Sequence, residues 1–232
     1  MDISALRSTS AHVFLDAGQL DADGSIELSD ENEHHLRRVL RLREGEVVSV
    51  TDGEGRWRLT SVVLSPGSLF LYPTSEVFSD DSERTPLELA VAIPKGDRLD
   101  WLVQKVTELG ADRILLLHSE RSIVRWKPER AAKQRIRLQR IADEACRQSR
   151  RVQRLVIDGP VDAITVLPSC VIAEPGGRRI TQSDRFVAIG PEGGWSQSEV
   201  DAALDRVDLG PNILRTETAA VAITTLCVAF DH

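Results

Sequence analysis

The stretch IGPEGGWS, residues 189–196, governs the architecture of the second half of the chain. Its first residue ends a short apolar run typical of a buried strand, and Ser196 forms the S-x-x-E pattern of a helix capping box with Glu199. Between strand and helix, Gly193 and Gly194 allow a ligand to approach the backbone closely. This is the sheet edge at which α/β proteins bind ligands. Taken alone, a motif this short more often marks a strand-to-helix turn that binds nothing.

Apolar runs and helical spacings alternate around this motif from Leu87 onward. Continuous apolar runs are typical of parallel strands buried on both faces, and strands that alternate with helices predict a parallel α/β sheet. Strands are expected at 87–93, 113–117, 154–157, 170–173, 186–189 and near Val207, with helices at 99–106 and 129–147. We therefore expect an α/β domain over residues 87–232.

The first part of the chain has a different pattern. Residues 1–77 contain short segments rich in Val, Leu and aromatics, separated by Gly-containing turns, which favours a small barrel or sandwich. Strands are expected at 46–50, 57–64 and 68–72, and one short helix at 31–39. The polar stretch that ends in Pro86 is interpreted as a linker between two domains.

Composition restricts the class of protein. With 232 residues and 41% hydrophobic residues, the chain can bury a sizeable core, which excludes global disorder. The three cysteines are few and far apart, which indicates a reducing compartment rather than a disulfide framework. No apolar run approaches the roughly 18 residues that span a bilayer, and the N-terminus lacks the apolar stretch of a signal peptide. We expect a cytoplasmic protein without a membrane partner.

Charge is strongly segregated along the chain. The net charge is −7, yet residues 121–154 hold twelve Lys or Arg against three Asp or Glu, a local balance of +9. This surplus favours a phosphate-binding face over a merely solvated helix face, although the spacing of Lys133, Arg137 and Arg140 fits either. No Cys/His spacing suggests zinc, so no metal site is expected.

A second motif, LGPNILRTETAA, occupies residues 209–220. A short strand and a Gly-Pro turn lead into a polar cluster, after which an apolar helix begins. The free backbone N–H groups of the first helical turn can bind a ligand. Alternatively, Thr216 or Thr218 serves only as a helix cap.

Together the two motifs resemble the hallmark pair of one family, the ribosomal RNA small subunit methyltransferase E family of the SPOUT class. Its members are 16S rRNA (uridine-1498-N3)-methyltransferases. Further matches in the same order cover nearly the whole chain: HHLRRVLR at 34–41, KVTELG at 105–110, ERS at 120–122 and EACRQS at 144–149. The sequence departs from the family at Arg147, where many members have an acidic residue, and at His12, which replaces part of an Arg-Phe pair. Both departures bear on RNA contacts rather than on the cofactor site.

The resemblance implies a PUA-like β-barrel at the N-terminus, an RNA-binding domain over residues 1–77. It also implies a SPOUT α/β domain over 87–232, with a deep trefoil knot formed from about residue 170 to the end. It implies a homodimer, which agrees with the nearly all-apolar run at 219–230, because such a helix must be covered on most sides. Its cofactor is S-adenosylmethionine. The residues expected to bind this cofactor are Ala173, Glu174, Ile189, Gly190, Pro191, Glu192, Gly193, Gly194, Leu209, Gly210, Leu214, Arg215, Glu217, Thr218 and Ala219.

The expected reaction suggests two catalytic residues. The proton on uridine N3 must leave, and negative charge then spreads over the neighbouring carbonyl oxygens. An arginine is suited to stabilise that charge, and Arg215 is the candidate. Glu217 is a candidate for accepting the proton, although it can equally bind the cofactor or cap its helix. The residues expected to bind 16S rRNA are Arg37, Arg38, Arg41, Arg121, Arg125, Arg137 and Arg150.

Two rival functions stay open at this stage. One is a SPOUT methyltransferase that acts on another RNA, such as tRNA. The other is a catalytically silent RNA-binding protein of ribosome assembly. The complete second motif argues against lost catalysis, because Arg215, Glu217 and both threonines are present.

Overall fold

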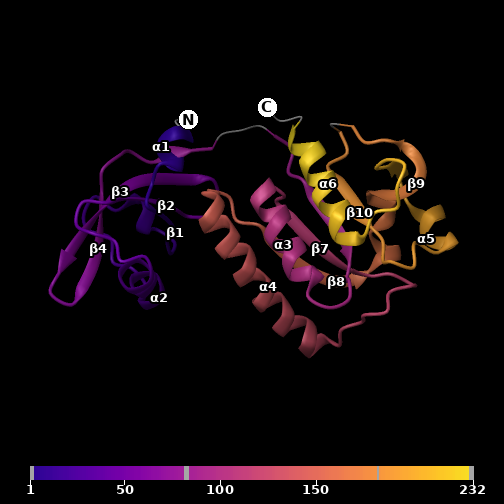
Figure 1. Cartoon of the computed structure of the whole chain (residues 1–232), viewed down its shortest axis with the longest axis horizontal. Helices are drawn as coiled ribbons and strands as arrows, with labels where there is room; N and C mark the ends of the chain where they lie inside the picture. Colours follow the sequence, from indigo (N-terminus) through magenta and orange to yellow (C-terminus); the bar gives the residue numbers. More distant parts are fainter. Residues whose placement is uncertain (1–2, 81–83, 182, 230–232) are drawn as a thin grey trace. The chain divides into compact units, whose positions relative to one another are not determined.

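The chain is described by a computed structural model over residues 3–80, 84–181 and 183–229 (Figure 1). Its contacts divide it into two compact units, Met1–Glu83 with Cys146–Arg154, and Arg84–Ala145 with Leu155–His232. The segment 146–154 therefore belongs to the first unit, although it falls within the α/β domain expected from the sequence.

The first unit is built on one sheet. Its strands are β1 (Ala11–Phe14), β2 (Val47–Thr51), β3 (Arg56–Ser65), β4 (Ser68–Pro73) and β5 (Phe78–Ser79). The order is β1-β2-β3-β4 with β5 beside β3; β1 is parallel to β2 and the other neighbours are antiparallel. The strands expected at 46–50, 57–64 and 68–72 are confirmed to within one residue at each end. Alternate side chains such as Val48, Val50 and Leu71 form the core, as the period of a strand requires.

Short helical segments complete this unit: α1 (Ile3–Arg7), a 3-10 turn (Gln19–Asp21), α2 (Asp30–His34) and a π-helical turn (His35–Val39). The sequence predicts a single helix over 31–39, and the structure instead changes from α to π geometry after His34. Leu36 is fully buried within the π turn, whereas Arg38 and Val39 face solvent. Periodicity alone does not distinguish these geometries over so short a segment.

The segment 146–154 is fixed to the first unit by hydrogen bonds to its backbone. Thr51 Oγ1 donates to the Val152 carbonyl at 2.9 Å, and His12 Nε2 donates to the Arg151 carbonyl at 2.8 Å. Burial lowers the pKa of His12 to about 4, so its ring is neutral at physiological pH. The sequence departure at His12 therefore has a structural role.

The second unit is a six-stranded sheet in which all neighbouring strands are parallel. Its strands are β6 (Glu88–Ala92), β7 (Arg113–His118), β8 (Val156–Asp162), β9 (Val171–Arg179), β10 (Phe186–Ile189) and β11 (Asp205–Asp208), in the order β11-β9-β10-β6-β7-β8. Its helices are α3 (Arg98–Leu109), α4 (Pro128–Ser149), α5 (Gln197–Ala202) and α6 (Thr216–Ala229), and 3-10 turns cover Ala163–Thr165 and Leu167–Ser169. The predicted parallel α/β fold is confirmed.

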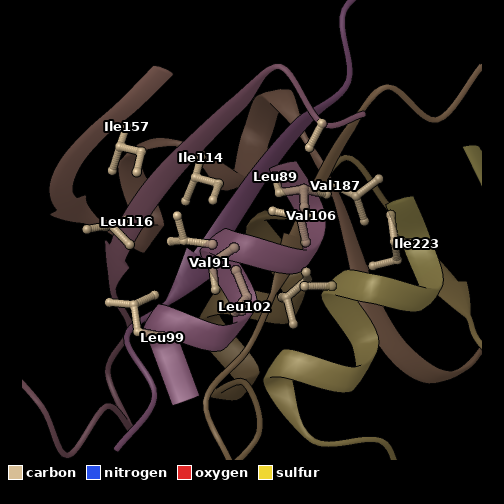
Figure 2. Close-up of a cluster of buried hydrophobic side chains, with 14 of the residues drawn as sticks. Leu89, Val91, Leu99, Leu102, Val106, Ile114, Leu116, Ile157, Val187 and Ile223 are labelled. Atoms are coloured by element: carbon tan, nitrogen blue, oxygen red, sulfur yellow. The ribbon is translucent and has the colours of Figure 1, made fainter. Parts of the chain in front are cut away.

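Helices α3, α4 and α6 pack on one face of this sheet. Figure 2 shows strand side chains such as Leu89, Val91 and Ile114 facing Leu102 of α3 and Ile223 of α6. These side chains are fully buried, and burial of aliphatic surface is the main force that holds the layers together. Helix α6 lies beside α3 (Figure 1). Packing in this core therefore fixes the position of the first turn of α6.

A second cluster covers the opposite face of the sheet. Here Ala90, Leu117 and Ile172 pack with Trp195 and Cys170. Burial raises the pKa of the Cys170 thiol to about 12, so this cysteine is an inert core residue. Within the described residues, no helix is both long and apolar enough to cross a membrane.

Candidate functional site

A cavity of about 340 Å³ lies at the carboxyl ends of strands in the second unit. Three segments form its wall: 173–175 on β9, 189–195 after β10, and part of 208–219 after β11. β9 lies between β10 and β11 in the sheet, and its Ala173 pairs with Ile189, the last residue of β10. β9 then continues to Arg179 opposite the end of β11, so segments distant in sequence converge beside β9.

The glycine turn that follows β10 is fixed from two sides. Thr216 Oγ1, at the start of α6, donates to the Gly190 carbonyl at 2.9 Å. Gly190 lies against the Trp195 indole, and a Cβ built on it would be 3.0 Å from Trp195 Cε2. Trp195 Nε1 in turn donates to the Ala173 carbonyl at 3.4 Å. The turn is therefore rigidly attached to both neighbouring segments of the cavity wall.

Asp208 connects the loop after β11 to β9. Its carboxylate accepts hydrogen bonds from the backbone N–H of Gly210 at 2.9 Å and of Gly176 at 2.8 Å. These two backbone donors, that of Gly210 first, lower the pKa of Asp208. An ionised Asp208 thus ties the loop after β11 to the segment on β9.

The capping box expected at Ser196 and Glu199 is present, and it does more than begin α5. Glu199 is 3% exposed and accepts three hydrogen bonds: from Ser196 N at 2.9 Å, Ser119 Oγ at 3.1 Å and Glu120 N at 2.9 Å. Beside it, Arg121 Nη1 donates to the Gly193 carbonyl at 3.2 Å. One buried carboxylate therefore joins the loop after β7 to the glycine turn.

Glu199→Ala is expected to lower the free energy of unfolding by about 2 to 3 kcal/mol, because it leaves donors without their acceptor and removes a helix cap. The measurement is the urea midpoint and slope, followed by circular dichroism. Gln197→Ala, at an exposed position of the same helix, is the control and should change stability by at most about 0.5 kcal/mol. Equal stability of the two variants would show that Glu199 does not fasten this loop.

Most residues expected to bind the cofactor line this cavity: Ala173, Glu174, Ile189, Gly190, Pro191, Glu192, Gly193, Gly194, Leu209, Leu214 and Ala219. Four others do not line it: Gly210, Arg215 and Thr218 are exposed, and Glu217 is buried. Pro175, Asn212, Ile213 and Thr216, which lie next to or between the expected residues, also line the cavity, and so do Trp195 and Asp208. Their only sequence signal is that each directly adjoins an expected segment.

A second buried carboxylate adjoins the cavity. Glu217 is 9% exposed, and its Oε2 has no hydrogen-bond partner among the described residues. Its Oε1 lies 3.7 Å from Nε of Arg98, the first residue of α3. Arg98 also donates from Nη1 to Glu192 Oε1 at 2.9 Å. The sequence contains no local signal for Arg98, because its partners follow it by more than ninety residues.

The basic residues expected to bind RNA differ in exposure and in their hydrogen-bond partners. In the second unit Arg121, Arg125 and Arg137 are exposed; Arg125 donates to the Ser119 carbonyl at 2.9 Å, and Arg137 pairs with Asp100.

In the first unit, Arg38 and Arg41 are exposed and Arg37 is half-buried. Arg37 donates to the Gly67 carbonyl, and the Arg150 guanidinium donates to the Thr9 and Arg147 carbonyls. Its hydrogen bonds therefore hold the segment 146–154 in place.

Comparison with known proteins matches both units. A family model described as an RNA methyltransferase domain matches residues 81–228, more than half of the chain. The ribosomal RNA small subunit methyltransferase E of Bacillus subtilis is 30% identical, over 87% of this chain and 88% of its own. The chain belongs to the ribosomal RNA small subunit methyltransferase E family. Another member, from Synechocystis, is 32% identical over 85% of this chain and 70% of its own.

Structures of related proteins agree with this family assignment. The small subunit methyltransferase E of Neisseria gonorrhoeae, solved with S-adenosylmethionine, has a TM-score of 0.79 at 28% identity, covering 95% of this chain and 97% of its own. A methyltransferase from Legionella pneumophila, also solved with this cofactor, has a TM-score of 0.80 at 28% identity, covering 94% and 97%. A family model for an RNA methyltransferase PUA domain matches residues 28–70 of the first unit. The chain is thus a methyltransferase E family member with an RNA methyltransferase domain and a PUA domain.

Proposed function

We propose that this protein transfers the methyl group of S-adenosylmethionine to N3 of a uridine in 16S rRNA of the small ribosomal subunit, at the position that corresponds to 1498. The observation that carries the proposal is the cavity at the ends of β9, β10 and β11. It is formed by the two motifs that distinguish the family, and family membership extends over most of the chain.

The cavity suits the proposed cofactor in composition. The turn 190–194 supplies backbone at close range, Leu209 and Leu214 supply apolar surface, and Glu192 supplies negative charge near the rim. The buried Oε2 of Glu217 adds an acceptor that no described residue satisfies. When bound, the cofactor would supply an electrophilic methyl group. Its sulfur would keep the electron pair of the bond to the methyl, and N3 would use its own pair for the new bond.

Arg215 is proposed to act on the RNA side of this cavity. It is exposed, and its neighbours Leu214 and Thr216 line the cavity. We assign it to the uracil oxygens, which gain negative charge as N3 loses its proton. Glu217 accepts that proton or, alternatively, a hydrogen bond from the cofactor. Arg215 and Glu217 are therefore the proposed catalytic pair.

Phosphate contacts are assigned to exposed or half-buried arginines of both units. Arg37, Arg38 and Arg41 serve the PUA-like domain, for which a small β-barrel is proposed. Arg121, Arg125 and Arg137 serve the methyltransferase domain. Such contacts exist equally in the ground and transition states, so they set RNA affinity and its salt dependence rather than turnover.

The proposed architecture includes the deep trefoil knot of the SPOUT class and a homodimer. Helix α6 supports the dimer, because it is apolar on most sides and Leu226 is nevertheless 41% exposed. The run that predicted the dimer from sequence extends to residue 230, which lies outside the described residues.

A dimeric mass is expected by light scattering at micromolar concentration, and Leu226→Glu should shift the protein towards monomer by placing a charge in an apolar interface. Leu204→Glu is the matched control, because Leu204 is 66% exposed on a different element. A wild-type protein that is monomeric throughout the micromolar range would contradict the dimer.

Transfer of labelled methyl from S-adenosylmethionine tests the proposed substrate. Three acceptors are compared: intact small ribosomal subunits, protein-free 16S rRNA and bulk tRNA. Small subunits should accept about one methyl per particle, at N3 of one uridine. Preferential labelling of tRNA would indicate the rival SPOUT activity, and no labelling despite cofactor binding would indicate a silent RNA-binding protein.

A further inference from the structure

Arg98 connects two segments that belong to the cavity site. Its Nη1 donates to Glu192 Oε1 at 2.9 Å, and its Nε lies 3.7 Å from Glu217 Oε1. Glu192 belongs to the glycine turn after β10, and Glu217 to the first turn of α6. One cation at the start of α3 therefore contacts acidic residues from both hallmark motifs.

Stability alone does not account for this arrangement. The side chains of Arg98 and Glu192 are 38% and 34% exposed, and exposed ion pairs contribute little to folding. Glu217 is different, because its side chain is only 12% exposed. Removing one partner of a buried charge leaves the other without compensation, and this is strongly unfavourable. Among the ion pairs formed by the described residues, Arg98 is the only cation that pairs with Glu217.

The second oxygen of Glu217 indicates what the arrangement serves. Oε2 is inaccessible to solvent and has no hydrogen-bond partner in the part of the chain that the structure describes. Buried polar atoms are rarely left unpaired, and an exception calls for an unseen partner. Thr216, directly before Glu217 along the helix, and Ala219, two residues after it, both line the cavity. A ligand in the cavity is therefore the natural source of the missing donor.

We propose that Arg98 is a positioning residue for methyl transfer. It pairs with Glu217 and turns Oε1 towards itself, so that Oε2 is presented to an N–H or O–H donor of the bound ligand. Through Glu192 it also fixes the spacing between the glycine turn and α6. This inference rests on the proposed function, since the donor belongs either to S-adenosylmethionine or to the target uracil.

A double-mutant cycle tests the coupling. Wild type, Arg98→Ala, Glu217→Gln and the double variant are compared in two assays. Calorimetry gives the Kd for S-adenosylmethionine, and single-turnover transfer to small ribosomal subunits, with both ligands saturating, gives the rate. Each single variant should show a Kd raised, or a transfer rate lowered, tenfold or more. The double variant should be no more impaired in Kd or rate than the more impaired of the two single variants. The control is Arg179→Ala, an exposed arginine on β9, and it should match wild type.

Either pattern of loss identifies the donor. A loss in Kd assigns it to the cofactor, and a loss confined to the rate assigns it to the uracil. The proposal would be overturned if Arg98→Ala kept both the Kd and the transfer rate within twofold of wild type. It would also be overturned if the losses of the two single variants multiplied in the double variant. Wild type that fails to methylate any RNA would sink the proposed function instead, and the Kd cycle would still test Arg98.

A stability cycle covers the case in which Arg98→Ala folds poorly. Its thermal midpoint should lie below that of wild type, and adding Glu217→Gln should raise it again, because no uncompensated carboxylate then remains buried. Arg98→Lys, which keeps the positive charge without the guanidinium fork, should recover part of the lost rate. A midpoint that falls further when Glu217→Gln is added would contradict the coupling.

Discussion

Gly193→Val is expected to abolish S-adenosylmethionine binding while the protein stays folded. Gly193 lines the cavity, and an added side chain takes up space that the cofactor needs. The protein tolerates the change, because a Cβ at this position meets nothing nearer than Arg121 Cβ at 3.5 Å, an ordinary contact. Calorimetry should show a Kd raised by a factor of a hundred or more, about 2.7 kcal/mol of binding free energy.

Gly24→Val is the matched control, since Gly24 lies in the first unit, has no atom within 4 Å of a Cβ and needs no positive φ. It should bind the cofactor as wild type does. Normal affinity in a folded Gly193→Val variant would remove the glycine turn from the cofactor site.

Arg215→Ala is expected to lower the single-turnover methyl-transfer rate about a hundredfold with RNA affinity nearly unchanged, the scale seen when one oxyanion donor is removed. Arg215 carries a cation that the cationic cofactor does not need, so the uracil oxygens are its proposed partner. These oxygens gain charge only as N3 becomes nucleophilic, so the loss should appear in the rate.

Lys133→Ala is the comparison, because Lys133 is exposed on the basic helix α4. It should weaken RNA binding and reduce its salt dependence, with little effect at saturating RNA. An Arg215→Ala variant that transfers methyl at the normal rate, or loses only RNA affinity, would make Arg215 a docking residue and contradict its transition-state role.

The sequence predicts most strands and helices of the second unit and most residues that line the cavity, because these are encoded locally. Apolar runs such as the one ending at Ile189 mark parallel strands, and the capping box at Ser196 begins α5 as expected. Glycines after a strand mark a turn that approaches a ligand. These signals depend on neighbours within about four residues along the chain.

Long-range contacts could not be predicted in this way. Arg98 reaches Glu192 and Glu217 only because the parallel sheet brings α3, the glycine turn and α6 together. Glu199 likewise appears in the sequence as a helix cap alone, whereas its bond to Glu120 depends on the position of β7. Local patterns contain no information about which distant loop a carboxylate will contact.

The packing of residues 146–154 was missed for the same reason. In the sequence this segment continues a basic helix, and Arg150 there has the same appearance as its neighbours. Its guanidinium instead donates to the Thr9 carbonyl, more than a hundred residues earlier. Charge density indicates a basic segment, but it does not tell which arginines form hydrogen bonds within the protein.

Mass spectrometry of 16S rRNA from cells that lack this protein tests the central claim most directly. Nuclease fragments that contain the uridine corresponding to position 1498 are compared between the parent, the deletion strain and strains complemented with wild type or Gly193→Val. The account predicts that the methyl on this uridine is absent from the deletion strain, returns with wild type and does not return with Gly193→Val. A fully methylated uridine in the deletion strain, or a loss of methylation confined to tRNA, would contradict it.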